Sequence, residues 1–270
     1  MAFPLPSSLS PSKVSSFKDC ALAFRFSAID HLPEPPAPPA VKGTLVHRAL
    51  ELLFCAPAAE RTLEMAQECL LEAHAELSAV DEFTALGLDE AAQREFVADA
   101  STMIDRYFLL EDPRAVNPIG IELRLEAEIG DLRLRGIIDR LELDDDGELV
   151  VTDYKTGRVP SERQERDRLG GVHFYSYLCE RLFGKRPARV QLLYLGPDPQ
   201  VIIATPSEQS TRALEKKVVA IWSAVERACE QEDFRPKPSA LCNWCAFKAY
   251  CPSFGGDPSA VTELTTVAAS

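Results

Sequence analysis

The stretch ELVVTDYKTG, residues 148–157, decides the fold of this chain. We expect it to form a short β-strand that carries Asp153, Tyr154 and Lys155 toward its end. Because successive side chains of a strand point to opposite faces, Asp153 and Lys155 share one side. The strand therefore presents a carboxylate and an ammonium group together.

The preceding stretch RGIIDRLEL, residues 135–143, supplies a second carboxylate, Asp139, and the turn DDDG at 144–147 joins the two stretches. A three-residue loop over 145–147, with Gly147 in the left-handed conformation, pairs residue 144 with residue 148. Shifting this register by one residue would set Leu141 against Thr152 and scramble the apolar face of the hairpin. The expected pairs are therefore Leu143 with Leu149, Leu141 with Val151, and Asp139 with Asp153.

This register places the carboxylates of Asp139 and Asp153 side by side. Cross-strand neighbours have Cβ atoms about 5 Å apart, and two carboxylates that close repel each other unless positive charge lies between them. A divalent cation with oxygen ligands is the natural occupant. The apolar phase also slips between Ile138 and Leu141, which predicts a β-bulge near Asp139, a device that often re-aims an active-site side chain.

The composition fits a protein with a substantial core and no membrane span. At 270 residues and 46% hydrophobic content, a single domain over residues 1–270 is expected. The sequence has no charge-free apolar run of roughly 18 residues, and its N-terminus lacks the features of a secretory signal. A cytoplasmic location is the default, where the eight cysteines indicate metal ligands or buried thiols.

The formal net charge of −13 argues against nucleic-acid binding by the surface as a whole. Residues 60–128 hold 17 acidic and 5 basic side chains, so most of the acidity belongs to one segment that could face away from DNA. The cations after the 148–155 strand could contact phosphates, or they could be solvated and paired with nearby acids. They are Arg158, Arg163, Arg166, Arg168, Lys185, Arg186 and Arg189.

Turn residues and periodicity predict the remaining elements. The proline-rich segment 33–40 is expected to be a connector rather than a helix, with Thr44 as the N-cap of a helix to about Phe54. Residues 205–208, TPSE, are expected to form a capping box. The capping box is expected to open a long helix that ends at about residue 231. Further helices are expected over 60–110, with a break near Gly87, and over 172–183, ended by Gly184. Strands are expected at 121–129, 132–143, 148–155, 188–195 and 200–204.

The order helix, three antiparallel strands, helix, strand gives an α/β core with a mixed sheet, and its Asp … Asp-x-Lys hairpin resembles the PD-(D/E)XK nuclease superfamily. GTLVHRALE (43–51), LSPSKVSSFKDC (9–20) and LCNWCAFKAYC (241–251) resemble motifs of RecB-family exonucleases with an iron–sulfur cluster, of the nuclease module of AddB-type helicase-nucleases, and of CRISPR-associated iron–sulfur nucleases. The resemblance implies a restriction-endonuclease-like α-β-β-β-α-β core in one nuclease domain, with an acidic helical insertion at 60–115, termini stapled by a cysteine cluster, and a flexible tail at 252–270.

The resemblance also implies an active site for Mg²⁺ or Mn²⁺. Asp139 and Asp153 would be ligands, together with the main-chain carbonyl of Tyr154. An imidazole nitrogen of His47 would be a further ligand and would shift the preference toward Mn²⁺. Lys155 would lie beside the metal-bound water, so that hydroxide attacks the phosphodiester in line.

Two positions depart from the family pattern. Ala21 follows the first cysteine where the family usually has proline, and His173 stands where the family has glutamine in a Gln-x-x-x-Tyr motif. His173, Tyr177 and Arg158 are the candidates for substrate contact. Glu122 matches a glutamate often found one strand earlier in the family, but its strand parity places it on the polar face, so a surface role stays equally open.

Cys242, Cys245 and Cys251 lie within ten residues of one another, and Cys20 supplies a fourth thiol. Four cysteines suit a tetrahedral Zn²⁺ and a [4Fe–4S] cluster alike; the resemblance favours the cluster. Because the ligands would close a loop of more than 200 residues, the expected role is structural. Trp244, Phe247 and Tyr250 are expected to shield the cluster rather than stack on a base, and Cys55, Cys69, Cys179 and Cys229 to be buried thiols.

The sequence therefore predicts a metal-dependent DNA exonuclease acting on single strands or ends in DNA repair or recombination. No GxxxxGK[ST] loop occurs, so a helicase would be a separate partner subunit. Two alternatives stay open. One is a catalytically impaired nucleic-acid-binding or helicase-partner module with the same fold, and the other is a nuclease stapled by zinc.

Overall fold

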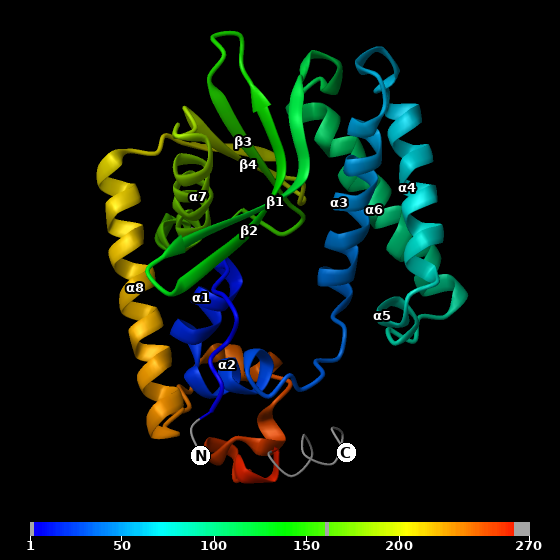
Figure 1. Ribbon diagram of the computed structural model, residues 1–270. Coiled ribbons are helices and arrows are strands. Elements are labelled where there is room, and N and C mark those ends of the chain that lie inside the picture. The colour runs from blue at the N-terminus through cyan, green and yellow to red at the C-terminus, as the bar shows by residue number, and fades with distance from the viewer. Residues whose placement is uncertain (1–2, 160–161, 262–270) are drawn as a thin grey trace. The chain divides into compact units, whose positions relative to one another are not determined.

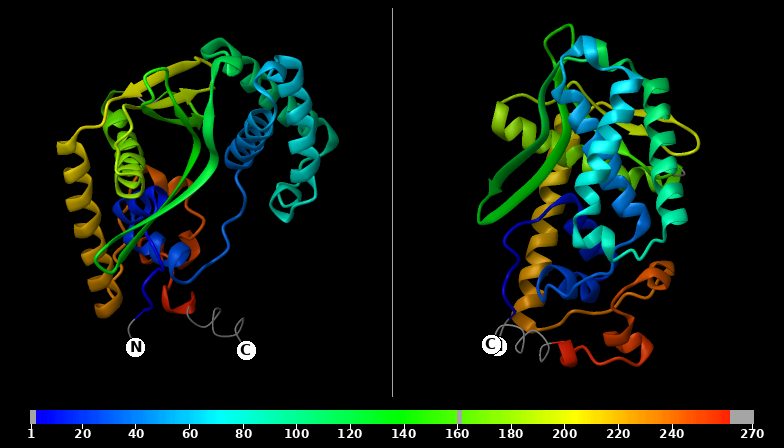
Figure 2. Two further views of the ribbon diagram at one scale, coloured as in Figure 1. Left: turned by 45° about the horizontal axis from the view of Figure 1, so that its top comes forward. Right: turned by 90° about the vertical axis from the view of Figure 1, so that its right-hand side faces the viewer.

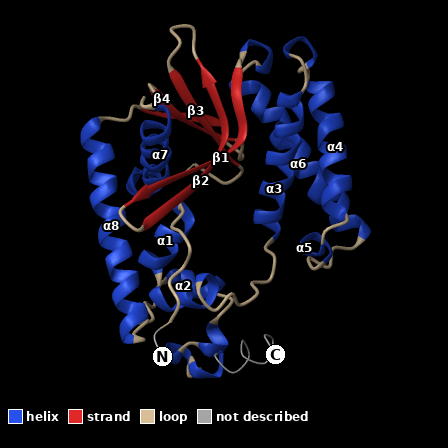
Figure 3. Ribbon diagram, viewed as in Figure 1, coloured by secondary structure: helices blue, strands red, loops and turns tan. Residues whose placement is uncertain are grey.

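The computed structural model describes residues 3–159 and 162–261 (Figure 1). Five strands form one sheet in the order β1-β2-β3-β4-β5 (Figure 3). The pairs β2–β3 and β4–β5 are antiparallel and β3–β4 is parallel, so the sheet is mixed, and α7 makes the crossover that parallel neighbours require. The α/β prediction is confirmed. The strands are β1 Pro118–Ile129, β2 Leu132–Leu143, β3 Leu149–Lys155, β4 Arg189–Tyr194 and β5 Gln200–Ala204, and α7 is Glu162–Phe183.

The β2–β3 hairpin has the predicted register. Gly147 has a φ of 73°, the left-handed conformation that the turn requires. The main-chain N–H of Asp144 donates to the Glu148 carbonyl at 3.0 Å, which closes the loop. The pairing then runs through Leu143 with Leu149, Glu142 with Val150, Leu141 with Val151, and Arg140 with Thr152, and ends there. The expected pair of Asp139 with Asp153 is not part of this ladder, because Asp139 accepts from the Tyr154 N–H.

The phase slip expected near Asp139 is present in β2. Burial alternates from Leu132 to Ile138 and then continues without a break through Glu142. Regular alternation would put Gly136 and Arg140 on one face. Instead a Cβ at Gly136 would lie 2.9 Å from Cδ1 of Leu178 on α7, whereas the Arg140 guanidinium lies 4.7 Å from the ring centroid of Phe54 on α3. Helices α7 and α3 lie on either side of the sheet (Figure 2).

The helical segment before the sheet begins earlier than predicted. Helix α3 starts at Pro38, inside the proline-rich stretch, because proline is tolerated in the first helical turn. Thr44 therefore lies within the helix rather than at its N-cap, and its hydroxyl donates to the Ala40 carbonyl at 3.3 Å. The helices are α3 Pro38–Cys55, α4 Leu63–Ser78, α5 Asp81–Thr84 and α6 Glu90–Leu110, with single 3₁₀ turns at Ala58–Glu60 and Pro113–Ala115.

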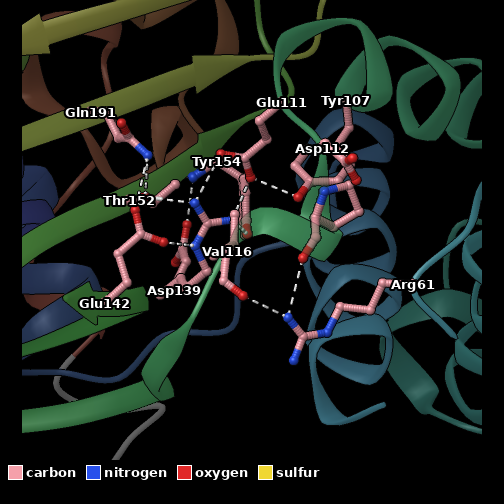
Figure 4. Close-up of polar contacts among 12 residues, drawn as sticks. Arg61, Tyr107, Glu111, Asp112, Val116, Asp139, Glu142, Thr152, Tyr154 and Gln191 are labelled. Atoms are coloured by element: carbon pink, nitrogen blue, oxygen red, sulfur yellow. Dashed lines mark hydrogen bonds and ion pairs between the residues drawn. The ribbon is translucent and has the colours of Figure 1, made fainter. Parts of the chain in front are cut away.

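Arg61 fastens the two ends of this helical segment to each other. Its guanidinium, on a side chain with little exposure, donates to the carbonyl of Val116 at 2.9 Å (Figure 4). It also donates to the carbonyls of Pro113 at 3.1 Å and Ala56 at 2.9 Å. The segment also packs its apolar faces together and against the sheet. Its core includes Leu45, Leu50, Leu53, Leu70, Ala100, Ile104 and Tyr107, with Tyr154, Leu193 and Leu195 from the strands.

The chain forms two compact units. One holds residues 36–125 and 136–211; the other holds residues 1–35, 126–135 and 212–270. In the second of these, the main chain of Leu9 bonds to β2, accepting from Arg135 and donating to Arg133, both at 2.9 Å. None of the helices in the described residues is long and apolar enough to cross a membrane. The helices not yet given are α1 Pro11–Asp19, α2 Ala21–Ala28 and α8 Glu208–Gln231, with 3₁₀ turns at Ala240–Trp244, Lys248–Tyr250 and Pro252–Phe254.

Three further helix ends can be compared with the predictions. Helix α8 is capped by Ser207 and not by Thr205, because Ser207 Oγ accepts from the Ser210 N–H at 3.1 Å and Ser210 Oγ accepts from the Ser207 N–H at 2.9 Å. Helix α7 ends at Phe183 and is stopped by Gly184, as predicted, because Gly184 adopts the left-handed conformation with a φ of 69°. Its start at Glu162 is about ten residues earlier than expected.

Candidate active site

The main chain of Tyr154 connects two of the predicted ligands. Its N–H donates to Oδ2 of Asp139 at 2.6 Å, and its carbonyl oxygen lies 3.1 Å from Nε2 of His47. Nδ1 of the same imidazole lies 3.5 Å from Oδ1 of Asp139. Burial alone would lower the pKa of His47, but the neighbouring carboxylates, Asp139 first among them, outweigh burial and raise it. Helix α3 and strands β2 and β3 thus bring His47, Asp139 and the Tyr154 carbonyl together.

Asp153 and Lys155 form an ion pair on one side of β3, as strand alternation predicts. The Asp153 side chain is buried, and burial raises the pKa of its carboxyl in spite of the nearby ammonium group. Burial lowers the pKa of Lys155, but the charge of Asp153 outweighs this effect and the net shift is upward. Lys155 therefore keeps its positive charge near the carboxylates of Asp153 and Asp139.

Glu122 of β1, for which the sequence left a surface role and a site role equally open, adds a third carboxylate. Its φ of 46° is rare for a residue with a side chain and interrupts the regular alternation of the strand. One ligand atom each of Glu122, His47 and Asp139 lies within 4.8 Å of the others. Burial raises the pKa of Glu122 to about 7, the charge of Asp139 adds to the rise, and His47 opposes it.

These groups suit a hard divalent cation. They offer carboxylate oxygens, one main-chain carbonyl and one imidazole nitrogen, which is a donor set for Mg²⁺ or Mn²⁺. Burial is the first cause of the raised pKa of Glu122, and the neighbouring carboxylate of Asp139 adds to it, so negative charge is concentrated in a part of the site with little exposure to solvent. A divalent cation would neutralise that charge. Asp153 is not one of the three residues within 4.8 Å of one another; its carboxylate contacts Lys155 and Tyr175 instead.

Helix α7 directs Tyr175 to the acids. The Tyr175 hydroxyl donates to Oδ1 of Asp153 at 3.4 Å, and burial raises its pKa, so it stays a donor. Tyr177, two residues further along, is 3% exposed, and the Arg181 guanidinium lies 6.0 Å from its ring centroid. His173 is half-buried and Arg158 is exposed. Substrate contact by His173, Tyr177 and Arg158 stays a prediction, whereas Tyr175 is a site residue that the motif comparison missed.

Several of the cations after β3 are paired with acids. Lys185 lies 2.8 Å from Oε2 of Glu148, and Arg189 lies 3.1 Å from Oδ2 of Asp144. Arg186 lies 3.8 Å from Oε1 of Glu180. These distances favour the paired interpretation for the three residues. The side chains of Arg163, Arg166 and Arg168 lie outside the part of the chain that the structure describes.

The four predicted cluster cysteines line one cavity in the unit that holds both termini. This cavity has a volume of about 450 Å³. Cys20 lies between α1 and α2. Cys242 lies in the 3₁₀ turn Ala240–Trp244, Cys245 directly follows that turn, and Cys251 lies between the two later turns. The four thiols are only partly buried. The cysteines lining the cavity are Cys20, Cys242, Cys245 and Cys251.

The aromatic residues around this cavity divide into two groups. The rings of Phe247 and Tyr250 lie 5.5 Å and 6.1 Å from that of Phe26. Trp244 is 79% exposed but lines the same cavity as the four cysteines, so its shielding role stays a prediction. Among the other thiols, Cys55 is exposed, contrary to prediction, whereas Cys69, Cys179 and Cys229 are buried as predicted.

Comparison with known proteins identifies the class. The sequence profile of the PD-(D/E)XK nuclease superfamily matches residues 8–252, and this chain belongs to that superfamily. The fold is similar to the crystal structure of a candidate exonuclease from Eubacterium rectale, with a TM-score of 0.55, 9% identity, and coverage of 88% of this chain and 87% of that one.

A second solved structure, described as SSO0001, is less similar. It has a TM-score of 0.33 and 16% identity, over 49% of this chain and 59% of that one, which is too low to define a shared fold. No curated protein matches.

Proposed function

We propose that this nuclease is a divalent-metal-dependent exonuclease that hydrolyses DNA at ends or in single strands. The observation that carries the proposal is the meeting of His47, Asp139, Glu122 and the Tyr154 carbonyl beside the Asp153–Lys155 pair. A divalent cation bound there supplies a Lewis acid for the phosphate. The donor set, with ligand atoms of Glu122, His47 and Asp139 within 4.8 Å of one another, supports this assignment.

The chain's own residues have distinct parts in this proposal. The Lys155 ammonium group, held by Asp153, orients the attacking water and neutralises charge that develops on the phosphate. The Tyr154 main chain fixes Asp139 and His47 relative to each other. The Tyr175 hydroxyl, which remains protonated, donates to Asp153 and holds that carboxylate in place.

The test is digestion of end-labelled single- and double-stranded DNA, and of RNA, with Mn²⁺ or Mg²⁺ after anaerobic purification. The wild type is expected to shorten DNA progressively from its labelled or unlabelled end, and EDTA to stop it. Lys155→Ala should lose activity. Lys185→Ala is the matched control, since Lys185 pairs with Glu148 on the surface. DNA left equally intact by wild type and Lys155→Ala would reject the enzyme and favour a nucleic-acid-binding module.

We further propose that Cys20, Cys242, Cys245 and Cys251 hold a structural [4Fe–4S] cluster. Support comes from the single cavity that all four thiols line and from the chemistry of four thiolates. An anaerobic absorption spectrum with metal analysis separates the alternatives. A broad band near the violet with stoichiometric iron supports the cluster, whereas a colourless protein with zinc supports a zinc staple. The Cys251→Ser variant should lose the group, and Cys55→Ser, with an exposed thiol, should keep it.

The same proposal places the protein in DNA repair or recombination, with a separate helicase supplying unwound strands. Co-purification with a motor protein from the native host, and stimulation of digestion by that motor on blunt duplexes, is the expected result. If the isolated protein digests blunt duplexes as fast without the motor protein as with it, no motor is needed.

A further inference from the structure

The residue directly after Asp139 begins a second, buried polar group on the other side of β2. The Arg140 side chain is fully buried. Its Nη1 pairs with Glu111, and its Nη2 lies 3.0 Å from Oε2 of the same carboxylate. Its Nε lies 2.9 Å from Oε2 of Glu142. The guanidinium of Arg140 is therefore compensated by two acids in the interior, and Figure 4 shows the group.

The remaining donors of Arg140 bind β3 behind the candidate site. Nη1 donates to the Tyr154 hydroxyl at 3.0 Å, and Nη2 donates to Oγ1 of Thr152 at 3.1 Å. Thr152 Oγ1 also accepts from the Gln191 amide at 2.7 Å, which extends the group to β4. The hydrogen bonds of Arg140 all come from its two Nη atoms, whereas Nε contacts Glu142 only as an ion pair. Removing a partner from a buried charge is strongly destabilising, so the Nη atoms hold the groups they bond in place.

Tyr154 is the one residue of this group that also belongs to the candidate site. Its side chain binds Arg140, and its main chain binds Asp139 through the N–H and approaches His47 through the carbonyl. The Tyr154 ring also packs edge-on against His47, with centroids 5.9 Å apart. A rotation of this peptide would move a carbonyl that the proposed function assigns to the cation.

The helical segment supplies the other end of the group. Glu111 is the C-cap of α6 and accepts from the Tyr107 hydroxyl at 2.6 Å. Arg61 fastens the chain just beyond it. The acidic segment is therefore tied to the back of the site by one carboxylate at its C-terminal end.

We propose that Arg140 is a positioning residue, which sets the Tyr154 peptide for cation binding and is itself held in place by Glu111 of the helical segment. The proposal rests on the proposed function, since it concerns the same cation site. It assigns the segment a role in that site beyond packing. Removing the Tyr154 hydroxyl should weaken cation binding, because groups that orient ligands typically contribute about tenfold or more to metal affinity.

The experiment compares Tyr154→Phe with Tyr107→Phe in the full-length protein. Both variants remove one buried hydroxyl that is bonded within this group, so both should lose similar stability. Only Tyr154 has main-chain contacts in the candidate site. Mn²⁺ affinity is measured by titration calorimetry and by the electron paramagnetic resonance signal of free Mn²⁺, neither of which depends on cleavage.

Tyr154→Phe is expected to bind Mn²⁺ about tenfold more weakly than wild type, and Tyr107→Phe to bind it equally well. Excess Mn²⁺ should restore cleavage by Tyr154→Phe. Glu111→Gln, which keeps the shape and removes the charge, should give a smaller loss of affinity. Wild-type affinity in Tyr154→Phe would overturn the positioning role and leave the proposed function intact. A wild-type protein that does not bind Mn²⁺ would overturn both.

Discussion

The Tyr175 hydroxyl donates to the carboxylate of Asp153 at 3.4 Å, across from the Lys155 ammonium group that holds the same carboxylate. Asp153 is thus supported from both α7 and its own strand. Tyr175 is not part of the Gln-x-x-x-Tyr pattern, in which Tyr177 is the tyrosine. Residues two positions apart on a helix point about 200° apart, so Tyr175 and Tyr177 face different surroundings.

Replacing Tyr175 by phenylalanine should lower the rate of metal-dependent cleavage by about tenfold, because a hydrogen bond to a charged group is lost. Tyr107→Phe is the matched control, since its buried hydroxyl donates to Glu111 and not to Asp153. It should reduce thermal stability without a comparable effect on rate. Single-turnover digestion of labelled DNA checks both variants. Equal rates for Tyr175→Phe and wild type would remove Tyr175 from the site.

Glu122 should make the cation-free protein more sensitive to alkaline pH. Its folded pKa of about 7 lies above the ordinary value of 4.5, so folding takes up a proton between these two pH values. Stability from this group is therefore present at low pH and lost as pH rises through that window. Glu122→Gln should raise stability at pH 8 relative to pH 5 by on the order of 1 kcal/mol, a figure reduced for solvent screening.

The measurement for Glu122 is the melting temperature in EDTA at both pH values. Glu95→Gln, on the exposed surface of α6, serves as the control. A shift of the same size at pH 5 and pH 8 in Glu122→Gln would show that the carboxyl titrates normally. Added Mn²⁺ should stabilise the wild type more than Glu122→Gln, since ligand binding to the folded state raises its stability.

Gly196 should not tolerate a side chain. A Cβ there would lie 2.6 Å from the Gly157 carbonyl oxygen, a main-chain atom that cannot move aside easily. Gly196→Ala is therefore expected to cost about 2 kcal/mol of unfolding free energy. Gly157→Ala is the control, because nothing lies within 4 Å of a Cβ at that position. Urea unfolding checks the pair, and equal stability of the two variants would contradict the close approach of these loops.

Arg61→Lys should destabilise the protein by about 2 kcal/mol, because an ammonium group cannot reach all the carbonyls that the guanidinium satisfies. The exposed pair of Arg114 with Asp112, with Nε 2.9 Å from Oδ1, provides the control. Arg114→Lys should change stability by less than about 0.5 kcal/mol. Chemical denaturation measures both changes. A small effect of Arg61→Lys would mean that packing alone holds the ends of the helical segment.

The sequence was sufficient to predict the β2–β3 hairpin and the two acids, Asp139 and Asp153, that it carries. The DDDG turn and the leucines of β2 and β3 admit one register that buries the apolar side chains, and the structure has it. The slip at Asp139 was visible because Ile138 and Leu141 point to opposite faces of a regular strand. These features depend on neighbours in the sequence, where periodicity is informative.

Three features could not be predicted in this way. Strand parity could not decide between a surface role and a site role for Glu122, because a positive φ at a glutamate has no sequence signal. The motif comparison did not name Tyr175, because the rotation of α7 about its axis relative to the sheet depends on packing at Gly136. The start of α3 was placed too late because Pro38 can begin a helix as readily as it can belong to a connector.

Strands β1 and β2 each run from one compact unit into the other, and the chain passes between the units at 35–36, 125–126, 135–136 and 211–212. No single cut therefore frees either unit as an intact piece. A protease that nicks one of these four passages leaves both halves still joined through the other three. Limited proteolysis should consequently yield fragments on a denaturing gel that stay together in gel filtration.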